Sequence, residues 1–161
     1  MVTVWKQPSA RFNVLLTEDR PREPEHWTRQ LPLLLEPQGV AAYLAQTGQE
    51  AVDLAGRIEM HAAVIDMSTP VSDAPAEAGQ TLSSAREGGL WLLELMRRLP
   101  KRPAIVVIRT PASDTRQAER VLGDALRLGA FSVLDKPVGL EQLLAVFRRV
   151  VDRRYHGFWP A

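Results

Sequence analysis

Five short apolar runs, separated by longer amphipathic segments, constrain the fold of this chain more than any other feature of its sequence. The runs cover residues 12–17, 40–45, 62–65, 104–108 and 131–134. Each has about the length of a buried parallel strand, because a strand covered by helices on both faces is apolar along its whole length. Strict alternation of strand and helix predicts an α/β protein with a doubly wound parallel sheet and right-handed crossovers.

The segments between the runs carry apolar residues at helical spacing. The clearest is the last, with an apolar stripe from Leu140 to Val151 and basic residues near its end that suit the helix dipole. Shorter stripes predict helices that include residues 51–58, 92–99 and 118–125. The segment after the first run is the weakest helix, because Pro32 should kink it or end it early.

The length and composition are those of one globular domain. A chain of 161 residues, 45% hydrophobic and 24% charged, has material for one core rather than two. We divide it into an N-terminal extension (1–11), a main domain (12–153) and an aromatic C-terminal tail (154–161). Residues 67–87 break the alternation with prolines and small polar residues, which predicts a long insertion loop after the third strand.

Charge and cysteine content exclude several classes of function. Lys and Arg number 20 and Asp and Glu 19, so the net charge of +1 gives no basic surplus for nucleic acid. The absence of cysteine excludes disulfides and thiolate metal sites and suits a reducing compartment. No apolar run reaches the ~18 residues that span a membrane, and the first residues lack the layout of a signal peptide. We therefore expect a soluble cytoplasmic protein that binds neither nucleic acid nor membrane.

Polar residues follow four of the apolar runs, at the points where the strands should end. Glu18 and Asp19 follow the first run, Asp66 the third, Thr110 the fourth and Lys136 the fifth. Parallel α/β sheets bind ligands beyond the carboxyl ends of their strands. Clustered carboxylates repel unless a cation neutralises them, and oxygen ligands alone suit Mg²⁺. A nucleophilic carboxylate, a metal and a lysine together indicate phosphoryl transfer.

With these residues the chain resembles the receiver domains of two-component response regulators, over about residues 12–151. The resemblance implies the flavodoxin-like fold of CheY, a five-stranded parallel sheet of order 2-1-3-4-5. Its motifs are Thr17-Glu18-Asp19 after the first strand, Val64-Ile65-Asp66-Met67-Ser68-Thr69-Pro70 after the third, Thr110 after the fourth, and Gly129-Ala130-Phe131 through Asp135-Lys136-Pro137 around the fifth.

The resemblance also implies an acceptor and a metal site. Asp66 would accept a phosphoryl group from a histidine kinase or phosphotransfer protein. Asp19 would bind Mg²⁺ directly and Glu18 directly or through water, while the backbone carbonyl of Ser68 would complete the protein's share of the coordination. The protein would then be no enzyme beyond catalysing its own phosphorylation and dephosphorylation.

Two further residues acquire roles from the same resemblance. Lys136 would pair with a phosphoryl oxygen, and Pro137, cis in many family members, would shape its loop. Thr110 would move its hydroxyl toward the phosphoryl group and report phosphorylation to the last two helices. Singly, each residue also suits a turn or a surface position. Their convergence on one edge of the sheet favours the functional interpretation.

Two departures from the family pattern leave a second hypothesis open. Val133 stands where the family usually has an aromatic ring that moves on activation, and Pro111, after Thr110, lacks the N–H that contacts the phosphoryl group. We favour a stand-alone phosphorylatable receiver that signals through contacts with an output protein. The alternative is a pseudo-receiver that binds partners or dimerises without phosphorylation. A flavodoxin-like cofactor binder is disfavoured, because the loops offer acidic groups and a proline rather than a phosphate cradle.

The aromatic residues suggest contacts that the strand ends do not explain. Tyr155, Phe158 and Trp159 in the tail should dock either on the domain itself or on a second subunit, so a homodimer stays open. Trp91 should lie on the outer face of its helix, under the insertion loop, where it covers apolar surface.

Overall fold

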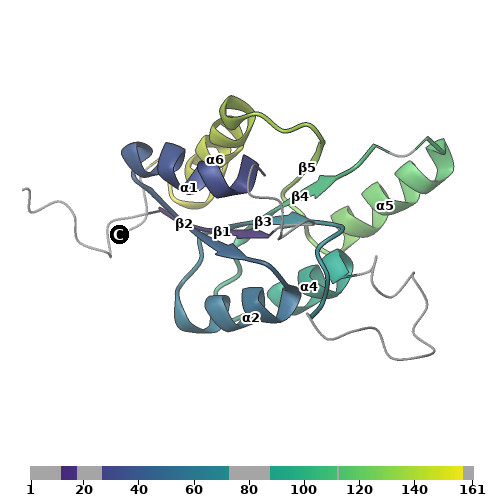
Figure 1. Ribbon diagram of the computed structural model, residues 1–161, viewed down its shortest axis with the longest axis horizontal. Helices are drawn as coiled ribbons and strands as arrows, with labels where there is room; N and C mark the ends of the chain where they lie inside the picture. The colour runs from purple at the N-terminus through teal and green to yellow at the C-terminus, as the bar shows by residue number, and fades with distance from the viewer. Residues whose placement is uncertain (1–11, 18–26, 73–87, 112, 158–161) are drawn as a thin grey trace, which may run out of the picture.

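A computed structural model describes residues 12–17, 27–72, 88–111 and 113–157. Within them, parallel strands form one five-stranded sheet of order β2-β1-β3-β4-β5 (Figure 1). The strands are β1 Phe12–Thr17, β2 Val40–Ala45, β3 Ala62–Asp66, β4 Ala104–Arg109 and β5 Ser132–Asp135. The sheet confirms the predicted strand order.

Helices cover both faces of the sheet, as predicted. They are α1 Trp27–Leu35, the 3-10 turn η2 Glu36–Gln38, α2 Gly48–Arg57, α4 Gly88–Met96, α5 Thr115–Arg127 and α6 Leu140–Arg154. In Figure 1, α1 and α6 lie on one face and α2 and α4 on the other. In the described part of the chain, no helix is both long and apolar enough to cross a membrane.

Of the two effects expected of Pro32, a kink or an early end, the structure overturns the early end of helix α1. It contains Pro32 and continues to Leu35. Leu31 and Leu35 are both buried in the core that α1 shares with α6. Burial of these two side chains holds the helix through a residue that would weaken it locally.

The alternation of side chains along each strand builds two apolar layers. On β1, Val14 and Leu16 face the layer that contains α1 and α6. Leu15, between them, faces the layer that contains α2, α4 and Ala125 of α5. A strand flanked by both layers must be apolar at every position. The strands therefore stand out in the sequence as continuous runs of apolar residues.

The segment that follows β3 is tied to the start of α2. The N–H groups of Gly48 and Gln49, in the first turn of α2, donate to the carbonyls of Pro70 (2.8 Å) and Val71 (3.0 Å). Helix N-termini have free N–H groups that need such acceptors. The first residues of the predicted insertion loop are therefore held beside α2, whereas its residues 73–87 lie outside the described part of the chain.

An aromatic cluster closes the opposite, amino edge of the sheet. The Phe12 and His61 rings stack with centroids 5.6 Å apart, and the Tyr155 ring meets them edge-on at 6.4 and 5.7 Å. Tyr155 thus docks on the domain itself, one of the two options for the tail. Phe158 and Trp159 lie outside the described residues.

Candidate functional site

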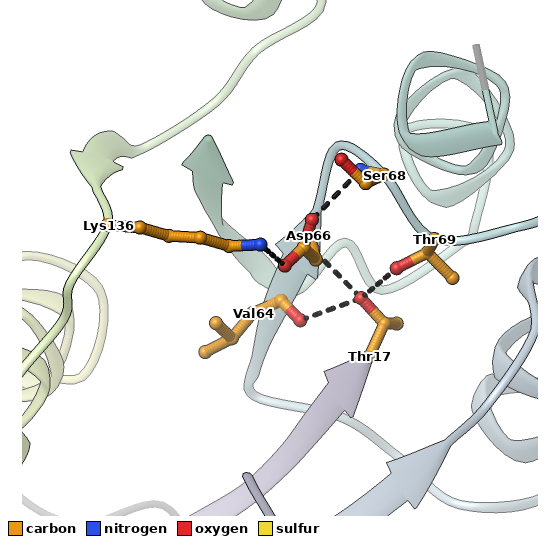
Figure 2. A network of polar contacts seen from close by, with 6 residues as sticks. All are labelled: Thr17, Val64, Asp66, Ser68, Thr69 and Lys136. Atoms are coloured by element: carbon orange, nitrogen blue, oxygen red, sulfur yellow. Dashed lines mark hydrogen bonds and ion pairs between the residues drawn. The ribbon is translucent and has the colours of Figure 1, made fainter. Parts of the chain in front are cut away.

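Asp66 ends the central strand β3 and is nearly inaccessible to solvent, with 2% of the residue exposed. β1 and β4 flank β3, and because Asp66 is the last residue of this strand, its carboxylate lies at the carboxyl edge of the sheet (Figure 2). A buried carboxylate is costly unless it is paired with a cation and hydrogen-bonded.

Lys136 provides the cation from the end of β5, the edge strand that lies beyond β4. It directly follows β5, and its Nζ lies 2.7 Å from Oδ2 of Asp66. The Lys136 N–H donates to the carbonyl of Arg109 (2.9 Å), which holds the lysine at the end of β4. The Lys136–Pro137 peptide bond is cis. Figure 2 shows the lysine side chain extended toward the acid.

The turn after β3 orients the other carboxylate oxygen. The Ser68 N–H donates to Oδ1 of Asp66 (2.9 Å), and the Thr69 N–H donates to the Asp66 carbonyl (3.1 Å). The first of these bonds is an Asx-turn, the structural explanation for an aspartate at a strand end. An Asx-turn uses one oxygen, however, and does not explain why Oδ2 meets a lysine from a distant strand.

Two buried threonines lie behind Asp66, and the sequence alone assigned neither a role. Thr17, the last residue of β1, accepts a hydrogen bond from the Asp66 N–H at its Oγ1 (2.8 Å). Thr69, which is fully buried, donates from its own Oγ1 to the same oxygen (3.0 Å). Both threonines belong to motifs of the resemblance, which implied no role for either of them.

The remaining predicted site residues are only partly placed. Thr110 directly follows β4 and is exposed, two positions beyond Ile108, the register partner of Asp66. Glu18 and Asp19 follow Thr17 but lie outside the described residues. The structure thus brings Asp66, Ser68 and Lys136 together and puts Thr110 at the same edge of the sheet.

The chemistry of the site suits a hard cation. The Asp66 carboxylate supplies oxygen donors, and the chain has no cysteine to offer a thiolate. Among the described residues no cluster of three or more acidic or imidazole side chains exists. A magnesium site therefore requires Glu18 and Asp19 to complete it, and β1 ends one residue before them, next to β3.

Arg109, which ends β4, links the site to α5. Its Nε lies 2.6 Å from Oδ1 of Asp135, its register partner on β5. Its Nη1 donates to the carbonyl of Ala118 in α5 (2.7 Å). The guanidinium thus fastens β4, β5 and α5 beside Lys136. Val133, on β5, packs into the core layer of α2 and α4.

Many solved structures share this arrangement of sheet and helices. A CheY-like response regulator receiver domain protein from Methanospirillum hungatei JF-1 superposes with a TM-score of 0.65 and 18% identity, over 91% of this chain and 98% of that one. The chemotaxis response regulator CheY4 of Vibrio cholerae superposes with a TM-score of 0.64 and 19% identity, over 87% of this chain and 98% of that one. A sensor protein from Polaromonas sp. JS666 superposes with a TM-score of 0.62 and 23% identity, over 88% of this chain and 97% of that one.

These likenesses define a class of fold. The chain has the flavodoxin-like fold of response regulator receiver domains, in agreement with its strand order. No protein-family model matches the sequence, and no curated protein matches it significantly.

Proposed function

We propose that this protein is a receiver of two-component signal transduction that accepts a phosphoryl group on Asp66. The observation that carries the proposal is the ion pair of 2.7 Å between Lys136 and the buried carboxylate of Asp66, at the carboxyl edge of a sheet with receiver topology. A carboxylate with a fixed ammonium beside it is suited to attack phosphorus, because the cation stabilises the charge that develops on the phosphoryl oxygens.

The donor would be a histidine kinase or a phosphotransfer protein. In the proposed step, an Asp66 oxygen attacks the phosphorus of a phosphohistidine and a P–O bond forms. The P–N bond breaks, and its electron pair returns to the imidazole. Lys136 would pair with a phosphoryl oxygen, a role that the contact of its Nζ with the Asp66 carboxylate supports. The protein would catalyse only this transfer and the later hydrolysis, so it is no enzyme in the usual sense.

Asp66, Glu18, Asp19 and the Ser68 carbonyl would hold the Mg²⁺ that such transfer needs. Bound there, the ion would neutralise charge on the phosphoryl oxygens. In the sequence Glu18 and Asp19 come directly after β1, and β1 is the immediate neighbour of β3, the strand that carries Asp66.

The proposed signal passes through protein–protein contacts in the cytoplasm. Thr110 would report phosphorylation from the end of β4 toward α5. Arg109, the last residue of β4, already links this strand end to α5, because its guanidinium donates to the Ala118 carbonyl. Because Pro111 has no N–H to offer the phosphoryl group, one contact usual in the family is missing.

Phosphorylation by a small-molecule donor tests the proposal. Incubation with acetyl phosphate and Mg²⁺ should add one phosphoryl group, measured by intact mass, and chelation of the metal should prevent it. Asp66→Asn should abolish the mass shift, because the amide is not a nucleophile. Asp53→Asn, which changes an exposed carboxylate on α2, should leave it unchanged.

A different outcome would support the pseudo-receiver. If wild type shows no mass shift, or if Asp66→Asn is modified equally, Asp66 is not a phosphoacceptor. Partner binding should then be indifferent both to Mg²⁺ and to the Asp66→Asn substitution.

A further inference from the structure

The hydroxyl of Thr17 uses its whole hydrogen-bonding capacity around Asp66. A threonine hydroxyl has one donor and two acceptor positions. Oγ1 donates to the Val64 carbonyl (3.4 Å) and accepts from the Asp66 N–H (2.8 Å) and from the Thr69 hydroxyl (3.0 Å). All three partners lie on β3 or in the turn after it, whereas Thr17 belongs to β1 (Figure 2).

This contact lies where the register between β1 and β3 stops. The last paired residues of these strands are Leu16 and Val64. Beyond them, the Thr17 side chain continues the connection and holds the peptide N–H of Asp66. The strand end that carries the carboxylate is therefore anchored to β1 by a side chain.

Burial restricts the geometry of the hydrogen bonds that Thr17 makes to Asp66 and Thr69. Thr17 is 3% exposed and Thr69 is 0% exposed. Water has little access to take over their bonds, and a buried N–H without an acceptor is costly. The two hydroxyls therefore hold the Asp66 backbone in one position, while Ser68 and Lys136 each hold one carboxylate oxygen.

We propose that Thr17 is a positioning residue for the phosphoryl-transfer reaction at Asp66 and that Thr69 holds the Thr17 hydroxyl in place. This inference rests on the proposed function. Attack on phosphorus needs a carboxylate oxygen at a set place and angle, and small displacements of a reacting group cost large factors in rate. Thr17 acts through the Asp66 peptide, without contact to the reacting oxygens.

Three substitutions separate positioning from packing. Thr17→Val keeps the shape and the strand preference but removes the hydroxyl, whereas Thr17→Ser keeps the hydroxyl and removes a methyl group. Thr69→Val removes only the supporting donor. The matched control is Thr47→Val, since Thr47 is also a buried threonine, but its hydroxyl accepts from the Glu50 N–H at the start of α2.

Two measurements are made on each full-length variant. The first is the initial rate of phosphorylation by acetyl phosphate with Mg²⁺. The second is the hydrogen exchange of the Asp66 amide, followed by NMR, which reads the anchor directly and does not depend on phosphorylation.

We expect Thr17→Val to lower the rate by about tenfold or more and to speed exchange of the Asp66 amide. Thr17→Ser should keep most of the wild-type phosphorylation rate and most of the protection of the Asp66 amide. Thr69→Val should lower both by less than Thr17→Val does. Thr47→Val should phosphorylate at the wild-type rate, although it is also destabilised. If Thr17→Val does not fold, the Ser variant and Thr69→Val still test the order of these effects.

The inference is overturned if Thr17→Val keeps the wild-type rate and amide protection, if Thr17→Ser fails to restore them, or if Thr47→Val loses the rate equally. Failure of the proposed function looks different, because wild type itself would then not be phosphorylated. The exchange of the Asp66 amide would still show whether Thr17 anchors this strand end.

Discussion

Asp66 illustrates how much one buried carboxylate demands of its surroundings. Its N–H, carbonyl, Oδ1 and Oδ2 each have a partner from the described residues. Those partners come from β1, from the turn after β3 and from the residue after β5. A residue that only ended a strand would need the turn alone, so the lysine and the threonine hydroxyl distinguish a built site from a cap.

His61 at the opposite edge should make folding stability depend on pH. Its Nδ1 accepts the Asn13 N–H (2.8 Å), which requires an unprotonated nitrogen. Burial lowers the pKa of His61 from 6.5, with a smaller opposing effect of Glu59 and a further lowering by Lys101. Below about pH 6.5, His61 therefore binds protons more readily in the unfolded chain than in the folded one. The contribution of His61 is therefore present above pH 6.5 and is lost as the pH falls through its folded-state pKa.

Urea unfolding between about pH 7.5 and 5.5 checks this prediction. His61→Asn offers a carbonyl oxygen to the Asn13 N–H without titrating, so we expect a flatter pH dependence than in wild type. His156→Asn is the control, because His156 is exposed with a φ of 54°, a conformation that asparagine tolerates. The prediction is wrong if the control flattens the dependence as much as His61→Asn does.

At the scale of elements, the packing of α2 against α4 depends on one glycine. A Cβ added at Gly48 would lie 2.7 Å from Cζ3 of Trp91, so the indole of α4 sits directly on the first residue of α2. Trp91 is 36% exposed and covers the α2 backbone, in line with its predicted place on the outer face of its helix. The contact also lies next to the bonds that tie Pro70 and Val71 to α2.

Substitution of this glycine should destabilise the fold. Gly48→Ala should lower the free energy of unfolding by about 1–3 kcal/mol, because the rigid ring must move. Gly56→Ala in the same helix meets no atom within 4 Å and should stabilise by up to about 1 kcal/mol through helix propensity. Thermal unfolding measures both. In a Trp91→Leu background most of the cost of Gly48→Ala should vanish, and an undiminished cost would contradict the proposed contact.

At the scale of the whole molecule, the sheet separates two kinds of edge. The carboxyl edge gathers Asp66, Lys136 and Arg109, whereas the amino edge is closed by the rings of Phe12, His61 and Tyr155. Parallel strands make this separation inevitable, because all carboxyl ends meet at one edge. A ligand bound at that edge contacts several elements at once and should stabilise the whole domain.

Beryllofluoride with Mg²⁺, a stable mimic of the phosphoryl group, should therefore raise the unfolding temperature. At a concentration of 100 times Kd, a ligand that binds only the folded state stabilises it by about 2.7 kcal/mol. For a domain of this size the shift is roughly 5–10 °C. Asp66→Asn should show no shift, whereas Asp53→Asn should show the full one. An equal shift in Asp66→Asn would place the ligand elsewhere on the molecule.

The sequence by itself determined the alternation of strands and helices, with each strand end within about one residue of its observed position. The physical reason is that strands buried on both faces are apolar throughout, and this is a local property. The strand order 2-1-3-4-5 followed from the resemblance, and Asp66 and Lys136 stood out because each is a charged residue that follows such a run.

Only the tertiary structure decided which side chains meet. Thr17 and Thr69 bond across 52 positions of the sequence, and nothing local distinguishes them from other hydroxyl residues in strands and turns. The pairing of Arg109 with Asp135 depends in the same way on the register of β4 and β5. Even α1 needed the burial of Leu31 and Leu35 to continue past Pro32. Contacts between distant segments form only once the strands lie side by side, so local patterns carry no record of them.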